Sequence, residues 1–175
     1  ALGLGETLVS EEIYQIVYAH IHKSMDIDNF GISFFDENEQ VIRAGYVISD
    51  GEPVDTDPIP PLELKPKGKG RQSDVIHTGE PLYFPDYQKA LQNSDIEYII
   101  QHNGRIKLRA SPDEKVIQSV LYAPMKRRGK TIGIMQAQSY RMSAFSQDDI
   151  NLFCALANVA SISVQNAELF ATLDK

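Results

Sequence analysis

The sequence predicts an α+β fold with a central antiparallel sheet. Apolar residues recur at helical spacing near both ends of the chain, at residues 8–25 and 147–173. Between these ends lie two pairs of β-rich runs, each pair joined by a short polar turn, as in antiparallel hairpins. Strands and helices do not alternate in the βαβ order that a parallel sheet requires.

The first third of the chain predicts a helix followed by a hairpin. The helix over 8–25 carries its apolar side chains at positions Ile13, Ile16, Val17, Ile21 and Met25. The runs 30–35 and 41–48 are rich in apolar and β-favouring residues, and the segment 36–39 between them has the composition of a turn. Two antiparallel strands are therefore expected after the first helix.

The middle of the chain is rich in proline and glycine. Residues 50–71 contain five prolines and three glycines, which predict a long loop without regular structure. A short helix over 72–77 should follow, with Gly79 as its left-handed cap. A short strand is expected over 82–84, where it ends at Pro85.

Residues 86–119 are expected to form a flap of short helices instead of strands. Ser94 is a suitable N-cap for a helix over 95–101, and Ser111–Pro112 can open another. Asn103–Gly104 is expected to close the first of these helices.

A second hairpin and a long helix complete the predicted fold. The β-rich runs 120–125 and 131–140 flank the charged segment 126–130, whose glycine suits an exposed turn. Ser146 then provides an N-cap ahead of three polar residues, and it opens the helix over 147–173.

Composition limits the functions that are open to the chain. Its 175 residues, 42% of them hydrophobic, suffice for one domain with a continuous core. A net charge of −7 argues against binding to nucleic acid. Cys154 is the single cysteine, which excludes an intrachain disulfide and fits the reducing cytoplasm. The most apolar stretch, 152–164, is shorter than the roughly 20 residues that cross a bilayer. We therefore expect a cytoplasmic segment without membrane contact of its own, belonging to a longer parent protein that can still be membrane-anchored.

Five short motifs follow one another in a consistent order and spacing. They are FGISFFDE at 30–37, HTGEPL at 77–82, APM at 123–125, GKTIGI at 129–134 and FSQDDI at 145–150. In this order the sequence resembles the GAF family over almost its whole length. The resemblance implies a GAF/PAS-like sheet with the terminal helices on one face and the helical flap over the other. It also implies a single GAF domain over 1–175.

The resemblance implies a non-catalytic sensory or regulatory domain of a signal-transduction protein, such as a sensor histidine kinase. Such a domain binds a small molecule, unidentified here, and relays the event through dimeric terminal helices. A ligand-free module for dimerisation and signal relay is an alternative. Binding of a cyclic nucleotide is another: Phe145, Asp148 and Asp149 match the family pattern, but segment 138–141 lacks its Asn-Lys pair.

Specialised chemistry is not expected. Family members that bind bilins need a chromophore cysteine, and those that reduce free methionine sulfoxide need several cysteines. Cys154 lies in an apolar helix, where an inert thiol is the ordinary interpretation. His20 and His22 point to different helix faces, so no metal or haem ligand set is predicted. We expect no catalytic residues, no metal and no cofactor.

The resemblance places the ligand pocket between the sheet and the flap. In the strand over 120–125, Tyr122 shares a face with Val120 and Pro124, and in the next strand Gln136 and Gln138 share a face with Ile132 and Ile134. If that face lines the pocket, the ligand-binding residues are expected to be Tyr83, Asp86, Arg105, Arg109, Tyr122, Gln136 and Gln138. If it points to solvent, the two glutamines are surface residues.

The last helix has a second apolar stripe beside the face assigned to the sheet. Its residues follow alternating spacings of four and three, which suit a parallel helix–helix seam: Leu152, Leu156, Val159, Ser163, Asn166, Phe170 and Leu173. Asn166 could fix the register. A plain amphipathic helix over a wide core is the alternative. The expected partners are a second copy, the small molecule and neighbouring domains of the parent chain.

Overall fold

The chain folds into helices and strands in the predicted order. The computed structural model describes the backbone of residues 4–91, 99–100, 106–107 and 115–173, and the side chains of residues 11–91 and 115–162. The described elements are α1 (Leu4–Ser24), β1 (Asn29–Asp36), β2 (Val41–Ser49), β3 (Glu52–Pro53), β4 (Leu62–Glu63), α2 (Arg71–Thr78), β5 (Leu82–Phe84), α3 (Tyr87–Leu91), β6 (Ile99–Ile100), β7 (Ile106–Lys107), β8 (Ser119–Arg127), β9 (Lys130–Ser139) and α4 (Gln147–Leu173).

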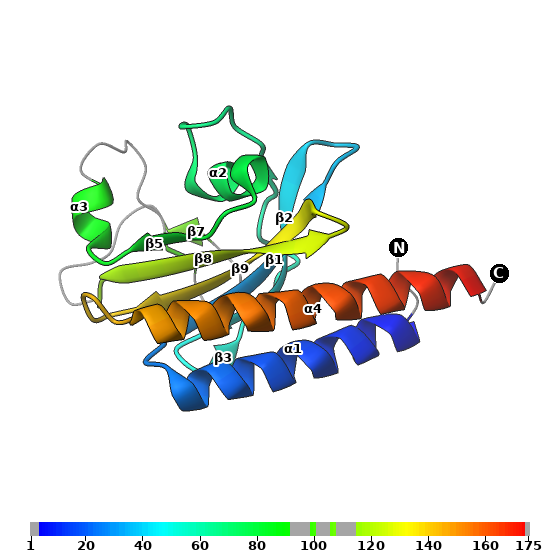
Figure 1. Cartoon of the computed structure of the whole chain (residues 1–175), viewed down its shortest axis with the longest axis horizontal. Coiled ribbons are helices and arrows are strands. Elements are labelled where there is room, and N and C mark those ends of the chain that lie inside the picture. Colours follow the sequence, from blue (N-terminus) through cyan, green and yellow to red (C-terminus); the bar gives the residue numbers. More distant parts are fainter. Residues whose placement is uncertain (1–3, 92–98, 101–105, 108–114, 174–175) are drawn as a thin grey trace.

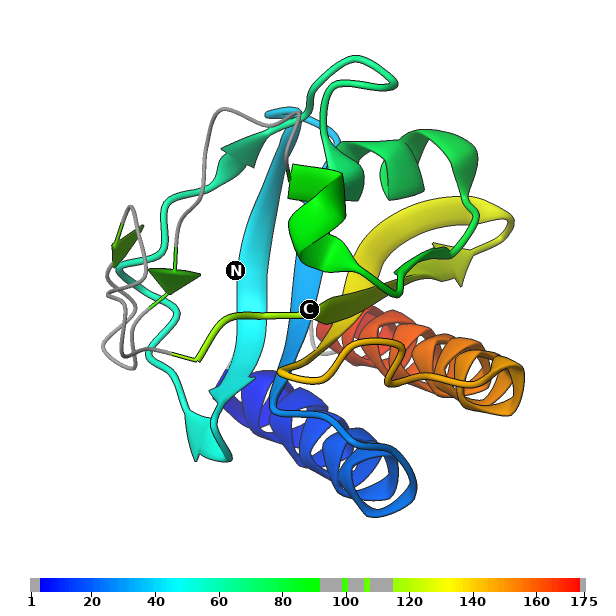
Figure 2. The same ribbon diagram turned by 90° about the vertical axis from the view of Figure 1, so that its left-hand side faces the viewer.

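One antiparallel sheet of seven strands forms the centre of the molecule. Its strands follow the order β3–β2–β1–β9–β8–β5, and β4 also pairs with β2. Helices α1 and α4 run side by side in opposite directions along one face of the sheet (Figure 1). The end-on view shows α2 and α3 over the other face (Figure 2). The α+β fold with terminal helices on one face is therefore confirmed.

The face towards α1 and α4, called the helix face below, is closed by apolar side chains. The largest buried contributors from the strands and helices include Val17, Ile21, Phe30, Ile32, Leu121, Met125, Met135 and Phe153. The rings of Phe30 and Phe153 meet edge to face, 6.5 Å apart. Burial of this surface provides the main stabilisation of the fold.

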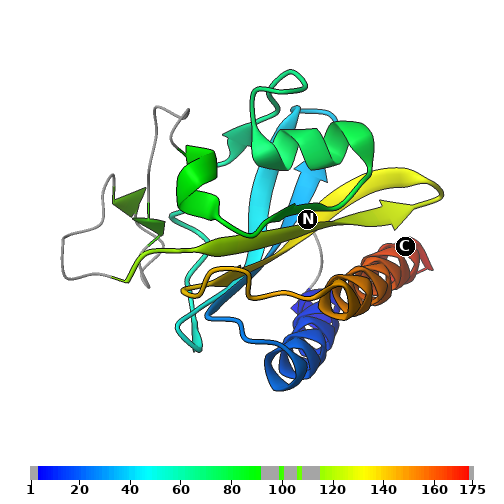
Figure 3. The same ribbon diagram turned by 60° about the vertical axis from the view of Figure 1, so that its left-hand side comes forward.

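Helix α2 lies over the opposite face, called the flap face below (Figure 3). This face carries a smaller apolar cluster. Val75 of α2 is fully buried there against Val120 and Ile134 of the sheet. Helix α2 ends at Gly79, whose φ of 66° confirms the predicted left-handed cap. Only part of the flap face lies under this helix.

Two expectations about irregular segments are wrong. The segment 50–71 contains β3 and β4, which pair with the two ends of β2 because the outer edge of that strand offers free backbone groups. The expected helix over 95–101 is absent at Ile99–Ile100, which pairs with Ile106–Lys107 as a strand instead. β-branched isoleucines favour the extended form. The rest of that helix, and Ser111–Pro112, lie outside the described residues.

Residues close in sequence determine the hairpin turn between β8 and β9 and the start of α4. Arg128 and Gly129 both have positive φ, 51° and 77°, as a two-residue hairpin turn requires. The Ser146 hydroxyl accepts the Asp149 N–H at 3.1 Å, and the Ser146 N–H donates to the Asp149 carboxylate at 2.9 Å. This reciprocal pair confirms the predicted cap. Within the described part of the chain, no helix combines the length and apolarity that crossing a bilayer requires.

Candidate functional site

Four residues of the flap face form one row across the sheet. Leu82 pairs with Tyr122, Tyr122 with Gln136, and Gln136 with Gly31. Side chains alternate along a strand, and the neighbours of these residues within each strand belong to the helix face. Tyr122 is 3% exposed, whereas Gln136 is partly buried. Tyr122 and Gln136 are therefore brought together, as the sequence predicted.

Gln136 differs from its neighbours because its side-chain amide forms no hydrogen bond within the described part of the structure. A primary amide offers two donors and a carbonyl acceptor, and the described residues use none of this hydrogen-bonding capacity. Gly31 lies opposite it on β1, and a Cβ added to Gly31 would meet only the Tyr46 carbonyl oxygen, at 3.8 Å. The backbone therefore leaves room beside this amide.

Ile132 does not share the face of Gln136, contrary to the expectation. A β-bulge between Met125 and Lys126 disturbs the pairing of β8 with β9, and Ile132 packs against the helix-face core. A bulge inserts one residue and thereby shifts the alternation on one side of it.

Gln138 lies on the same strand as Gln136 but is engaged by the protein. Its Oε1 accepts a hydrogen bond from Asn29 Nδ2 at 3.1 Å. Asn29 Oδ1 in turn accepts the Asp50 N–H at 3.0 Å, so the two amides join the start of β1 to the turn after β2. Gln138 therefore has a structural contact for which Gln136 shows no counterpart among the described residues.

Tyr83 lies on the helix face, away from Tyr122 and Gln136. It pairs with Leu121 and therefore alternates away from the flap. Its ring contacts Phe145 edge to face, with 5.8 Å between the ring centroids, and its hydroxyl accepts the Phe145 N–H at 3.2 Å. Tyr83 thus fastens the segment before α4 and is not grouped with the other predicted ligand residues.

Asp86 caps the first helix of the flap. Its carboxylate accepts the Lys89 N–H at 3.2 Å, at the start of α3. Asp86 is thereby fixed in the segment between β5 and α3. Arg105 and Arg109 lie outside the described residues.

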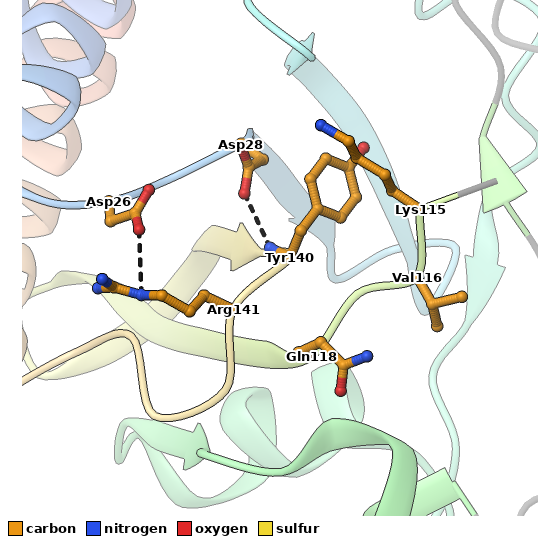
Figure 4. Close-up of a pocket in the computed structure, with 7 residues that line it drawn as sticks. All are labelled: Asp26, Asp28, Lys115, Val116, Gln118, Tyr140 and Arg141. Atoms are coloured by element: carbon orange, nitrogen blue, oxygen red, sulfur yellow. Dashed lines mark hydrogen bonds and ion pairs between the residues drawn. The ribbon is translucent and has the colours of Figure 1, made fainter.

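A shallow depression of about 520 Å³ lies at the end of the sheet (Figure 4), lined by Asp26, Asp28, Lys115, Val116, Gln118, Tyr140 and Arg141. Its charged groups face one another. Arg141 Nε lies 3.1 Å from the Asp26 carboxylate, and the Asp28 carboxylate accepts the Tyr140 N–H at 2.8 Å. Lys115 Nζ lies 5.5 Å above the Tyr140 ring. None of the predicted site residues that the structure describes lines this depression, and no sequence pattern indicated it.

Burial raises the pKa of the Tyr140 hydroxyl, and the Asp50 carboxylate, which accepts its hydrogen bond at 2.7 Å, raises it further. Tyr140 therefore remains a neutral donor. Its side chain lines one side of the depression and is held there by the hydrogen bond to Asp50.

Cys154 lies on α4, partly buried, and packs against the helix-face core. Burial raises the pKa of its thiol, and the carboxylate of Glu80 adds to the effect. Both causes disfavour the thiolate, which is the nucleophilic form.

The stripe predicted on α4 is partly exposed. Leu152 and Val159 are 38% and 49% exposed, but Leu156 packs against the helix-face core. The exposed apolar residues instead include Ile162, at 56%, so the outward stripe runs through positions 152, 155, 159 and 162. The side chains of Asn166, Phe170 and Leu173 lie outside the described set.

The fold defines a class of α+β domain in which a pair of long helices covers one face of the sheet and the short helices α2 and α3 lie on the other. The family model of the GAF domain matches residues 8–165. The chain belongs to the GAF domain family. No curated protein matches it.

Solved structures share the fold at low sequence identity. The type II free methionine-R-sulfoxide reductase from Thermoplasma acidophilum is 16% identical, with a TM-score of 0.64 over 92% of this chain and 95% of that one. The GAF domain of the Acinetobacter phosphoenolpyruvate-protein phosphotransferase is 16% identical, with a TM-score of 0.59 over 96% and 97%. The GAF domain/HD domain protein from Geobacter sulfurreducens is 19% identical, with a TM-score of 0.63 over 94% and 97%.

Proposed function

We propose that this GAF domain is a non-catalytic regulatory module of a larger signal-transduction protein, such as a sensor kinase, and that it binds a small molecule on the flap face. The observation that carries the proposal is the half-buried amide of Gln136, which has no hydrogen-bonding partner among the described residues and lies beside the open position at Gly31. A few well-placed polar groups on an apolar surface are the usual means by which a pocket orients its ligand.

The surroundings of Gln136 favour an uncharged part of the ligand at this point. The residues in register with it, Gly31 and Tyr122, carry no charge. The apolar cluster of Val120 and Ile134 continues on the same face. An amide held there can donate to and accept from one ligand edge at the same time.

The ligand site can be tested by a thermal-shift screen of nucleotides, amino acids and organic acids. A ligand stabilises the native state by mass action, about 2.7 kcal/mol at a hundredfold excess over Kd. We expect Gln136→Met and Tyr122→Ala to lose the shift that wild type shows. Gln15→Met, on the exposed side of α1, should keep it and serves as the control. Unchanged shifts in both site variants would place the ligand elsewhere.

The absence of catalysis is part of the proposal. Reduction of a sulfoxide through a sulfenate and an intrachain disulfide needs a second cysteine, and Cys154 is the single one in the sequence. Its raised pKa disfavours the thiolate as well. Incubation with free methionine sulfoxide and a thiol reductant should give no methionine above the protein-free rate. Turnover that is lost in Cys154→Ala would contradict the proposal.

We also propose that the signal passes through a homodimer formed by the terminal helices. The exposed apolar side chains Leu152, Val159 and Ile162 follow the spacing of a helix–helix seam. On α1, beside α4, Ile16 is 61% exposed and adds to the apolar surface of the helix pair. Apolar side chains at these positions are unfavourable in water, and contact with the helices of a second copy would bury them.

Light scattering over a range of concentrations tests the dimer. The double change Val159→Glu and Ile162→Glu should shift the chain to monomer because it places charges in the seam. Asn38→Glu, in the exposed turn between β1 and β2, adds the same kind of charge away from the seam and should leave association unchanged. A wild-type chain that is monomeric at high concentration would contradict the dimer.

A ligand-free relay module is the second candidate function. It is favoured by the packing of α2, which buries Val75 and thereby closes part of the flap face. A screen that yields no stabilising ligand, together with a stable dimer, would support it over the sensor.

A further inference from the structure

Arg71, the first residue of α2, connects elements that are separate along the chain. Its guanidinium carbon lies 5.6 Å from the centroid of the Phe84 ring, at the end of β5, and 5.1 Å from that of Tyr87, in α3. Its Nη2 donates a hydrogen bond of 3.1 Å to the carbonyl oxygen of Ala90. One side chain thus contacts the end of β5, the start of α3 and its last turn.

Helix α3 depends on contacts of this kind. It has five residues, and a helix of that length is not stable alone in water. Its start is anchored by the Asp86 cap and by hydrogen bonds from Tyr87 N–H to Gln118 O and from Gln88 Nε2 to Ile117 O, each of 2.8 Å. The hydrogen bond from Arg71 instead reaches the penultimate residue of α3, at its far end.

The aromatic group around Arg71 extends to the flap-face site. The rings of Phe84 and Tyr122 meet edge to face at 6.1 Å and 88°. Phe84 and Tyr87 meet in the same way at 6.1 Å and 71°. Tyr122 pairs with Gln136, so contacts run without interruption from the proposed ligand site to Arg71. Displacement of the Tyr122 ring would therefore disturb the rings on which the guanidinium stacks.

We propose that Arg71 is a latch that holds α3 against the sheet, and that release of this latch uncovers the part of the flap face on which Tyr87 packs. The latch follows from the contacts of Arg71 alone, whereas its effect on ligand entry rests on the proposed function. Arginine suits the role because its planar group stacks on rings and donates a directed hydrogen bond at the same time. A lysine at this position would keep the charge, but it lacks the planar group that stacks on the rings while it donates the hydrogen bond.

The charge of Arg71 has no carboxylate partner among the ion pairs of the described residues. The faces of two rings and a carbonyl oxygen hold it instead. The latch should accordingly depend less on salt than a surface ion pair does.

Hydrogen exchange followed by mass spectrometry tests the latch on the whole chain. Arg71→Met should raise exchange in peptides covering 87–91 by about tenfold, since a cation–π contact and a hydrogen bond to a charged donor are lost together. Peptides from β8 and β9 should exchange as in wild type. Arg71→Lys should give an intermediate value. Lys69→Met removes an equal charge from the adjacent loop and should leave 87–91 unchanged.

Unchanged exchange over 87–91 in Arg71→Met would overturn the latch. A rise spread equally over β8 and β9 would also overturn it, because Arg71 would then only support the fold. If Arg71→Met does not fold, Tyr87→Leu removes one ring of the latch, and the same local rise is expected.

The ligand provides a separate readout. With a ligand from the screen, Arg71→Met should raise both the association and the dissociation rate, whereas Gln136→Met should weaken affinity chiefly through dissociation. Rates unchanged in Arg71→Met would overturn the role of the latch in ligand entry. A screen without ligands would count against the proposed function, and the exchange result would still decide the latch.

Discussion

The two faces of the sheet are built from the same strands but differ in chemistry. On the helix face, Met135 and Ala137 of β9 are fully buried beneath α4. On the flap face, the alternate residues Gln136 and Gln138 are partly buried amides. One face is closed by two long helices and the other by the short helices α2 and α3. A single strand thus buries one set of side chains in the core, and under the proposed function it offers the other set to a ligand.

This difference indicates where substitutions should matter. Changes on the helix face should lower the free energy of unfolding, because the large apolar side chains there are buried and closely packed. Changes around Gln136 should alter binding with little effect on folding. Paired substitutions, one on each face, test this difference.

The largest expected effect is that of Phe153→Ala. The Phe153 side chain is fully buried and contacts Phe30, and truncation of a buried phenylalanine costs about 3–5 kcal/mol of unfolding free energy. Gln136→Met on the other face should cost less than about 1 kcal/mol. Urea denaturation measures both. Equal losses in the two variants would show that the faces do not differ in this way.

Two glycines of the sheet provide a second comparison. A Cβ on Gly133 would lie 2.5 Å from the backbone oxygen of Ser33, which cannot move without distorting β1. Gly133→Ala should therefore destabilise the chain by about 1–3 kcal/mol. Gly31→Ala meets nothing closer than 3.8 Å and should be neutral or stabilising by up to about 1 kcal/mol. Thermal unfolding of the two variants tests this, and a destabilised Gly31→Ala would contradict the room assigned beside Gln136.

A smaller effect is expected at the amide pair that Gln138 forms. Asn29→Ala removes the hydrogen bonds to Gln138 and to the Asp50 N–H, and it should cost about 1–2 kcal/mol. Gln138→Ala removes one of them and should cost less. If Asn29→Ala had no effect on unfolding by urea, the contrast between Gln138 and Gln136, which has no hydrogen-bonding partner among the described residues, would lose its basis.

The sequence predicted the regular elements well because their signals are local. The capping pair of Ser146 and Asp149 and the left-handed cap at Gly79 are decided by residues within one turn. The short strands β3 and β4 could not be predicted, since each has two residues and is extended because the edge of β2 pairs with it. Ile99–Ile100 is a strand for a similar reason, through β7.

The positions of some candidate site residues were predicted. The sequence grouped Tyr122 with Gln136, and the structure pairs them across β8 and β9. It could not reveal that Tyr83 alternates to the helix face, because the register of β5 on β8 depends on pairing that the sequence does not show. The role of Arg71 was missed as well. Its partners Phe84, Tyr87 and Ala90 lie 13 to 19 positions further along, and no periodic pattern links them to Arg71.

The smallest expected effect concerns the thiol of Cys154 on the helix face. Its pKa is raised by burial and by Glu80, so the folded state favours the neutral thiol. The stabilisation from this preference is complete below the pKa of the unfolded thiol, about 8.5, and is lost as the pH rises towards the higher pKa of the folded state. Cys154→Ala should therefore flatten the fall of the melting temperature between pH 8 and 10, after subtraction of the titration of tyrosines that both chains share.

Alkylation by iodoacetamide at pH 8 should likewise be slower in the folded chain than in the same chain in urea, because only the thiolate reacts. A folded chain that reacts as fast as the unfolded one would mean that packing on the helix face does not protect Cys154. The helix face would then be less tightly packed than its buried apolar side chains indicate.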